Sequence, residues 1–238
     1  MKKRRQYRGF SLVEVLLAVG TLAVGMIFIS GTFLTGIHFS TISTERTIAA
    51  VVAEEAFAKV RLYGVNLTDP NLVVNQQLSF ESLNVIADDE FAYPSTKTLT
   101  GKQYYWSALC RPVYSDSANR LVQVTVFISR KIGGSLKYQG GMGRPVPMQV
   151  GVSGAVGDRV ITITDNIQFI NDGYTIVESE TGNIYRVVER GANPAYPEQI
   201  TLAANKLWQG GDSVWVIPPP IGGGRNPLIG IYQKLISF

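Results

Sequence analysis

The chain has 238 residues, of which 45% are hydrophobic and 17% are charged. This composition supports a folded core and excludes a disordered or collagen-like chain. Five of the 22 basic residues lie within the first nine positions, which leaves 17 basic against 18 acidic residues in the rest of the chain. The body is therefore not basic, and we expect no nucleic-acid partner.

The first predicted element is an apolar helix near the N-terminus. Residues 15–37 are 23 consecutive positions without a formal charge. At about 1.5 Å per residue, such a helix crosses the roughly 30 Å hydrocarbon core of a bilayer. Basic residues precede this stretch and the next one is Arg46. This asymmetry predicts a single span with a cytoplasmic N-terminus and an extracytoplasmic body.

An acidic residue lies at the start of this stretch. A basic leader ends at Gly9, and Phe10-Ser11-Leu12-Val13 is followed by Glu14. A secretory signal peptide would instead have a shorter apolar run and an A-x-A-like cleavage site. A carboxylate near the centre of a membrane helix costs roughly 2.5–3.5 kcal/mol and usually has a partner. Glu14 has none in its own segment, so either another chain supplies one, or Glu14 belongs to an ordinary anchor and reaches the headgroups.

The run from Gly9 to Ala18 resembles the class III signal and N-terminal helix of type IV pilins and type II secretion pseudopilins. The resemblance implies cleavage by a prepilin peptidase between Gly9 and Phe10, and methylation of Phe10 as the new N-terminus. It also implies that Glu14 pairs with the terminal amine of a neighbouring subunit during assembly. The implied partners are the peptidase, other pilin or pseudopilin subunits, an inner-membrane assembly platform and membrane lipid.

The helix is expected to continue beyond the membrane. Residues 44–62 contain no proline or glycine, and Gly64 ends the run. Apolar residues recur at three- and four-residue spacing on one face of this segment (Ala49, Val52, Ala53, Ala56, Phe57 and Val60). A helix over residues 10–62 would be roughly 80 Å long. Four glycines in its apolar half indicate either flexibility or close helix packing (Gly20, Gly25, Gly31 and Gly36).

The rest of the chain is predicted to be mostly β-structure. After a loop-rich connection over 65–103, residues 104–109 and 121–128 form two strands joined by a polar turn at 114–120. A Gly/Pro-rich linker or long loop follows at 132–147. Five short β-type runs at 160–164, 174–177, 184–188, 199–202 and 213–217 suggest a small barrel or sandwich, with a hairpin turn at 180–183. The segment 228–238 either returns as an edge strand or docks on a partner.

Catalytic and metal-binding patterns are weak in this sequence. The single histidine, His38, is at the predicted membrane boundary, and the single cysteine, Cys110, cannot form an intramolecular disulfide and is interpreted as a buried hydrophobe. The acidic run 88–90 lacks the ligand series of a calcium loop, and the glycine-rich run 151–157 lacks the lysine of a P-loop. We interpret both as turns. No metal, cofactor or catalytic residue is expected.

These observations predict an α+β protein in which a long pilin-type helix packs on a small antiparallel sheet and an all-β module follows. The expected segments are a leader (1–9), an assembly helix (10–40), an α+β domain (41–131), a linker (132–147) and a C-terminal β-module (148–238). The expected function is that of a bacterial minor pilin or pseudopilin of an inner-membrane system, which is not an enzyme. The mature subunit would be part of a type IV pilus (fimbrium), a periplasmic type II secretion pseudopilus or a DNA-uptake fibre. The alternative is a membrane-tethered binding module whose β-domain recognises a surface, glycan or exoprotein.

Overall fold

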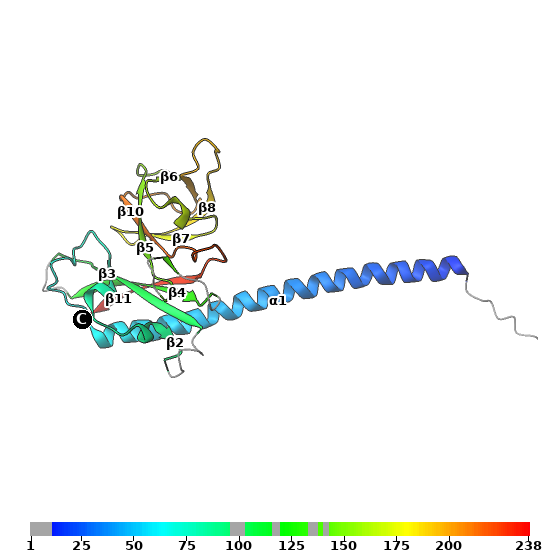
Figure 1. Ribbon diagram of the computed structural model, residues 1–238, viewed down its shortest axis with the longest axis horizontal. Coiled ribbons are helices and arrows are strands. Elements are labelled where there is room, and N and C mark those ends of the chain that lie inside the picture. Colours follow the sequence, from blue (N-terminus) through cyan, green and yellow to red (C-terminus); the bar gives the residue numbers. More distant parts are fainter. Residues whose placement is uncertain (1–10, 96–102, 116–119, 133–137, 140–142) are drawn as a thin grey trace, which may run out of the picture. The chain divides into compact units, whose positions relative to one another are not determined.

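The computed structural model describes residues 11–95, 103–115, 120–132, 138–139 and 143–238. The chain forms two compact units, Met1–Arg46 and Thr47–Phe238. A single helix, α1, begins at Leu12 and ends at Tyr63, so its first part belongs to one unit and its last part to the other (Figure 1). Antiparallel β-structure follows this apolar helix, which confirms the α+β class.

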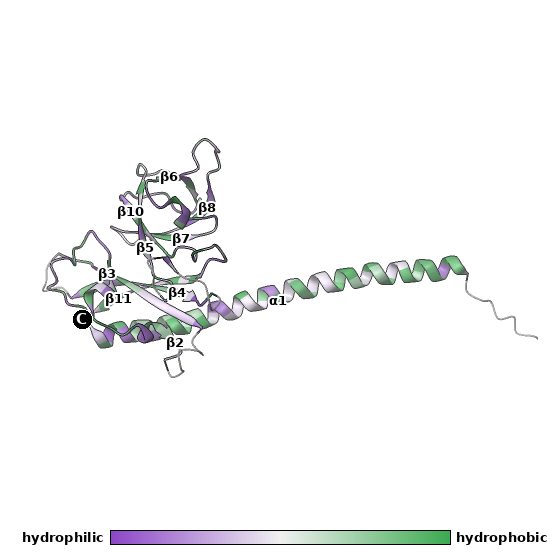
Figure 2. Ribbon diagram, in the orientation of Figure 1, coloured by the Kyte–Doolittle hydropathy of each residue, from purple (hydrophilic) through white to green (hydrophobic). Residues whose placement is uncertain are grey.

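The last part of α1 packs through the face that the sequence predicts. All six apolar positions named above are buried, whereas the first part of the helix is exposed. Apolar residues dominate the first part, and hydrophilic residues alternate with apolar ones in the last part (Figure 2). The helix ends at Tyr63 because Gly64 adopts a φ of 75°, and the Gly64 amide donates to the Val60 carbonyl at 3.0 Å. This is the predicted C-terminal cap.

The segment after α1 consists of short elements, as expected for a loop-rich connection. They are β1 (Leu78–Ser79), α2 (Phe80–Leu83), the 3₁₀ helix η1 (Asp88–Phe91) and β2 (Ala92–Tyr93). Both β1 and β2 pair with the same edge of the following strand, β3 (Tyr104–Pro112). Two short strands therefore protect this edge of the sheet.

The two predicted central strands form an antiparallel pair, β3 and β4 (Leu121–Arg130). Residues 116–119 of the expected turn lie outside the described residues. Alternate side chains of the sheet face α1 and form the first core with its buried positions (Trp106, Ala108, Cys110, Val122, Val124, Val126, Ile128 and Ile236). The alternating valines of β4 are therefore explained by burial against the helix.

The second β-structure is a closed barrel, which decides between the two predicted architectures. Its order is β10-β5-β6-β9-β8-β7, and its strands are β5 (Met148–Ser153), β6 (Val160–Ile163), β7 (Thr175–Glu178), β8 (Ile184–Arg190), β9 (Gln199–Leu202) and β10 (Ser213–Val216). A short 3₁₀ helix, η4 (Ile167–Phe169), lies between β6 and β7. The five predicted strands correspond to β6–β10, and the predicted hairpin turn joins β7 to β8.

One barrel strand was not predicted. The glycine-rich run 151–157 was interpreted as a turn, but its first three residues belong to β5. This strand position requires glycine, because a Cβ at Gly151 would collide with the Oγ1 atom of Thr164. A glycine that seemed to mark a turn therefore marks a close approach of two side-by-side segments.

The last strand, β11 (Leu228–Ser237), returns as an edge strand, one of the two predicted possibilities. It pairs antiparallel with β4 in the first sheet, whose order is β1-β3-β4-β11. The prediction had placed residues 228–238 in the C-terminal module with the barrel strands. This boundary is corrected: the barrel is inserted between β4 and β11, which are neighbouring strands of the first sheet. The sequence did not reveal this, because an apolar strand pattern does not specify which strand it pairs with.

The other face of the sheet contacts the barrel. Leu109 and Phe127 of the sheet form a third cluster with Val177 and Ile217 from the barrel side. Both faces of β3 and β4 are thereby covered, and most residues of these strands are buried. In the stretch expected to be a linker, Tyr138 and Arg144 are also buried. Figure 1 shows the barrel beside the sheet formed by β3, β4 and β11.

Candidate functional site

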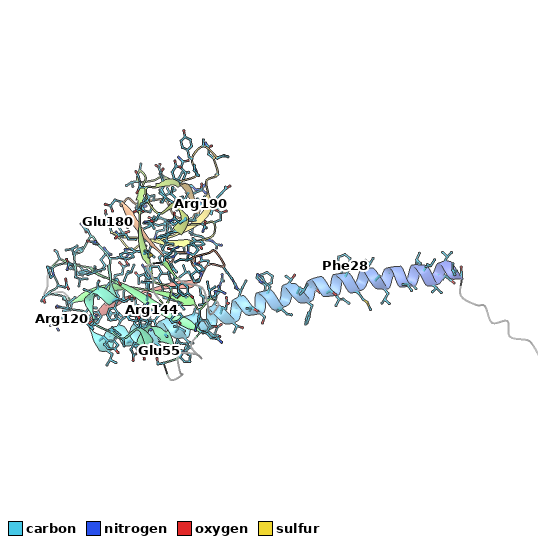
Figure 3. The ribbon with its side chains drawn as sticks, in the orientation of Figure 1. Phe28, Glu55, Arg120, Arg144, Glu180 and Arg190 are labelled. Carbon is cyan, nitrogen blue, oxygen red and sulfur yellow. The ribbon has the colours of Figure 1, made fainter. Side chains whose placement is uncertain are left out.

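The candidate site is the exposed first part of α1. The described residues include one helix that is long and apolar enough to cross a membrane, and none of its apolar window is buried. Signal sequences share this property of length and composition. The large side chains along it are exposed to solvent, for example Leu12 (78%) and Ile27 (72%). Figure 3 shows Phe28 projecting from the helix away from other side chains. So much apolar surface requires lipid or another protein around it.

Glu14 lies in the first turn of this helix. The Ser11 amide donates to the Oε2 atom of Glu14 at 3.0 Å, and the Val13 amide donates to the Ser11 hydroxyl at 3.3 Å. Ser11 and Glu14 thus satisfy free amides at the helix start as in a capping box, except that the serine hydroxyl accepts the Val13 amide and not the Glu14 amide. The expectation that Glu14 has no partner in its own segment is therefore wrong. The spacing Ser11-x-x-Glu14 in the sequence could have revealed this hydrogen bond.

The cap gives the Glu14 carboxylate a backbone hydrogen bond and no cation. Within the described part of the chain, no cation pairs with this carboxylate, which accepts a backbone amide and lies at the positive end of the helix dipole. A cation from another molecule can therefore still bind it. Gly9 and Phe10, the predicted cleavage and methylation positions, lie outside the described residues.

Small residues follow Glu14 along one side of α1. Ala18, Thr21 and Gly25 are separated by three or four residues, as are Thr32 and Gly36, which places both groups on one face of the helix with Phe28 and Ile29 between them. A shallow apolar groove of about 400 Å³ lies on this part of the helix and is lined by Ile29, Thr32, Phe33, Gly36, Ile37 and Ser40. A Cβ at Gly25 or Gly36 would meet no atom within 4 Å. These two glycines are therefore not required by contacts within the chain.

The hydroxyl groups of this helix are satisfied internally. Thr21 donates to the Ala18 carbonyl at 2.9 Å, Ser30 to Met26 at 2.8 Å, and Thr35 to Gly31 at 2.9 Å. Such bonds to the preceding turn satisfy the polar hydrogen of each side chain without water. The serines and threonines are thus compatible with an apolar environment.

The acidic run at 88–90 pairs with the chain's own cations. The Asp88 carboxylate lies 3.5 Å from the Nε atom of Arg144, and the Glu90 carboxylate lies 2.8 Å from the Nζ atom of Lys59. No group of three metal-ligating side chains occurs among the residues that the structure describes. Instead, the run helps to attach η1 to its neighbours.

Arg144 is the central residue of that attachment. Its guanidinium is 3% exposed, forms an ion pair with Glu81, donates to the Ser107 hydroxyl at 2.9 Å and lies 4.1 Å from the centre of the Phe91 ring (Figure 3). Sequence analysis missed this residue because it lies in the Gly/Pro-rich stretch. A lone arginine among glycines and prolines carries no local signal of burial.

A second polar cluster lies where the barrel meets the sheet. Glu178 is fully buried, and Arg111 and Lys206 lie close enough for its charge to affect them. Burial lowers the pKa of both Arg111 and Lys206, and the negative charge of Glu178 opposes that shift.

No protein-family model, curated protein sequence or solved structure matches the chain.

Proposed function

We propose that the chain is a structural minor subunit of the pilin or pseudopilin type. A prepilin peptidase cuts it between Gly9 and Phe10, and Phe10 becomes the methylated N-terminus. The exposed apolar part of α1 anchors the precursor in a bacterial inner membrane, with the body on the extracytoplasmic side. It later packs among other subunits of a type IV pilus or a secretion pseudopilus. The proposal assigns no catalytic step and no cofactor to the chain.

The observation that carries this proposal is an exposed apolar helix whose first turn holds a carboxylate with no cationic partner among the described residues. An anchor needs the apolar surface, and Glu14 gives it only a helix cap while the carboxylate charge opposes burial in lipid. Assembly uses both features, because a neighbouring N-terminal amine would neutralise Glu14 while the small residues on the same face allow close helix packing. Glu14 and the small residues between Ala18 and Gly36 on the same face of α1 therefore support assembly over simple anchoring.

The barrel supports the assignment to a minor subunit. It is inserted between β4 and β11, so the helix and sheet remain a continuous scaffold that carries an additional body. A tethered binding module would be favoured by a large aromatic patch on that body. The barrel aromatics Tyr174, Tyr185 and Trp208 are buried, and Tyr196 is the large exposed aromatic among residues 148–217. The burial of these aromatic side chains therefore favours the structural subunit over the binding module.

The test uses two substitutions of Glu14 that separate its charge from its capping role. Glu14→Gln removes the charge but can still accept the Ser11 amide, because glutamine also serves in a capping box. Glu14→Ala removes both functions. We expect both variants to insert in the membrane and both to be depleted from sheared fibres. The measurement compares membrane and fibre fractions by immunoblot.

Ser11→Ala is the matched control, since it weakens the cap and retains the carboxylate. It should enter fibres like the unmodified chain. If Glu14→Gln assembles normally and only Glu14→Ala and Ser11→Ala fail, Glu14 acts as a helix cap and the assembly role is wrong.

A further inference from the structure

The barrel and the sheet have separate hydrophobic cores. The barrel core consists of residues between Val150 and Val216. The sheet core consists of residues of α1, of the connection 65–91 and of the sheet, and the two clusters share no residue. The apolar contact between them consists of the buried Leu109, Phe127, Val177 and Ile217, against which the partly buried Ile184, Trp215, Leu228 and Ile231 pack. Separating the two bodies would therefore expose this small cluster without opening either core.

The sheet face that contacts the barrel is rich in polar side chains. Ser107, Thr125 and Ser129 are buried on it, and Gln123 and Gln233 project from the same face. Strands with one solvated face have such residues at alternate positions. Polar contacts of this kind are typical of interfaces between domains that can separate.

Hydrogen bonds hold the turn 179–183, between β7 and β8, on this face. The Arg111 guanidinium donates to the Glu180 carbonyl at 3.0 Å, and the Gln233 amide donates to the Gly182 carbonyl at 2.6 Å. The backbone amide of Gln77 donates to the Ser179 carbonyl at 2.9 Å. Three separate segments of the sheet unit thus bind a single turn of the barrel.

The turn and its binding site are each held in shape. The Glu178 carboxylate accepts the Thr181 amide at 2.6 Å and also the Glu180 amide and the Thr181 hydroxyl. On the sheet, the Oε1 atom of Gln123 accepts two hydrogen bonds from Arg111, at 3.0 and 2.7 Å. The contact therefore joins two preorganised surfaces.

This contact lies at the end of the sheet opposite to both chain connections. The chain leaves the sheet after Arg130 and returns at Leu228, and Leu228 is paired with Ser129. Arg111 is paired with Gln123, near the other end of β4. The barrel is therefore tied covalently at one end of the sheet and by hydrogen bonds at the other.

We propose that the turn 179–183 is a latch, and that its release lets the barrel undock from the sheet while both bodies stay folded. The inference does not depend on the proposed function, because it uses only contacts within residues 47–238.

Hydrogen exchange of the full-length chain in detergent micelles tests this proposal. The Gln77 amide reports on docking because its acceptor, Ser179, belongs to the barrel. The amides of Val124 and Val187 report on the sheet and on the barrel, respectively. In the unmodified chain, we expect Gln77 to exchange faster than both core amides.

Gln233→Ala weakens the latch without touching the Gln77 bond. It should accelerate Gln77 exchange roughly two- to twelve-fold, as expected for the loss of one net hydrogen bond between the sheet and the turn, and leave Val124 and Val187 unchanged. Lys234→Ala is the matched control: its side chain contacts Glu54 and the Phe57 ring of α1, so it should leave Gln77 exchange unchanged.

Two results would overturn the latch. If Gln233→Ala accelerates all three amides equally, the barrel and the sheet open only together. If Gln77 exchange does not respond to Gln233→Ala, that amide opens by local fraying and the barrel is not released.

Discussion

Glu14 and Arg144 differ in how far along the chain their partners lie. The partner of Glu14 is three residues away, so its capping role could be predicted from the Ser-x-x-Glu spacing. Arg144 binds Glu81, Asp88 and Ser107, which are far earlier in the sequence. No local pattern identifies such contacts, because only the folded chain brings these residues together. Residue roles were therefore predictable where they depend on near neighbours.

Cys110 provides a test at the scale of single residues. It is fully buried on β3, as predicted, and burial raises the pKa of its thiol to about 12. An ordinary cysteine thiol has a pKa near 8.5 and is substantially ionised at pH 9. We expect iodoacetamide to modify the folded protein very slowly at pH 9 and the urea-unfolded protein rapidly. Equal rates, measured by mass spectrometry, would show that Cys110 is accessible.

The same shift gives a pH dependence of stability. Between the ordinary thiol pKa and about 12, the unfolded state loses a proton that the folded state retains. The free energy of unfolding therefore falls as the pH rises through this range, and the Cys110 contribution is neutral below it. Cys110→Ala should remove this part of the alkaline loss.

At the scale of elements, prediction succeeded where a hydrophobic period was long or a turn was clear. The buried face of α1 and its end at Gly64 follow from spacing and from a glycine cap. The strand β5 was missed because Gly151 interrupts its apolar pattern and Gly154 directly follows its end. Both glycines are needed where other side chains approach the backbone, Thr164 at one and Ile161 at the other. Such approaches are tertiary contacts, which a single sequence does not display.

Gly211 provides a test at this scale. Its φ is 99°, and an added Cβ would lie 2.5 Å from the Oε1 atom of the buried Glu178. Gly157 has a similar φ of 94° with no atom within 4 Å of the added Cβ, so it is a matched control for backbone strain. Gly157→Ala should lower the free energy of unfolding by about 1–3 kcal/mol, and Gly211→Ala should lower it further. Equal losses in urea titrations would show that the Glu178 contact is unimportant.

At the scale of the whole molecule, the class and the secondary structure were predictable, but the connection of the parts was not. The sequence predicted a sheet followed by a separate β-module, whereas β11 returns to the first sheet after the barrel. Its apolar residues fit either an edge strand or a docking segment, and only the pairing with β4 decides between them. The assembly site could be proposed from ten residues because the resemblance that suggests it rests on a short local motif, Gly9 to Ala18.

The central claim is that α1 becomes the N-terminus of a mature assembly subunit. The most direct test is the intact mass of the protein purified from native membranes, combined with sequencing of its N-terminal peptide. The account predicts a chain that lacks residues 1–9, begins at Phe10 and retains the whole apolar part of α1. A chain that begins at Met1, or one that was cut after the apolar segment, would contradict the account.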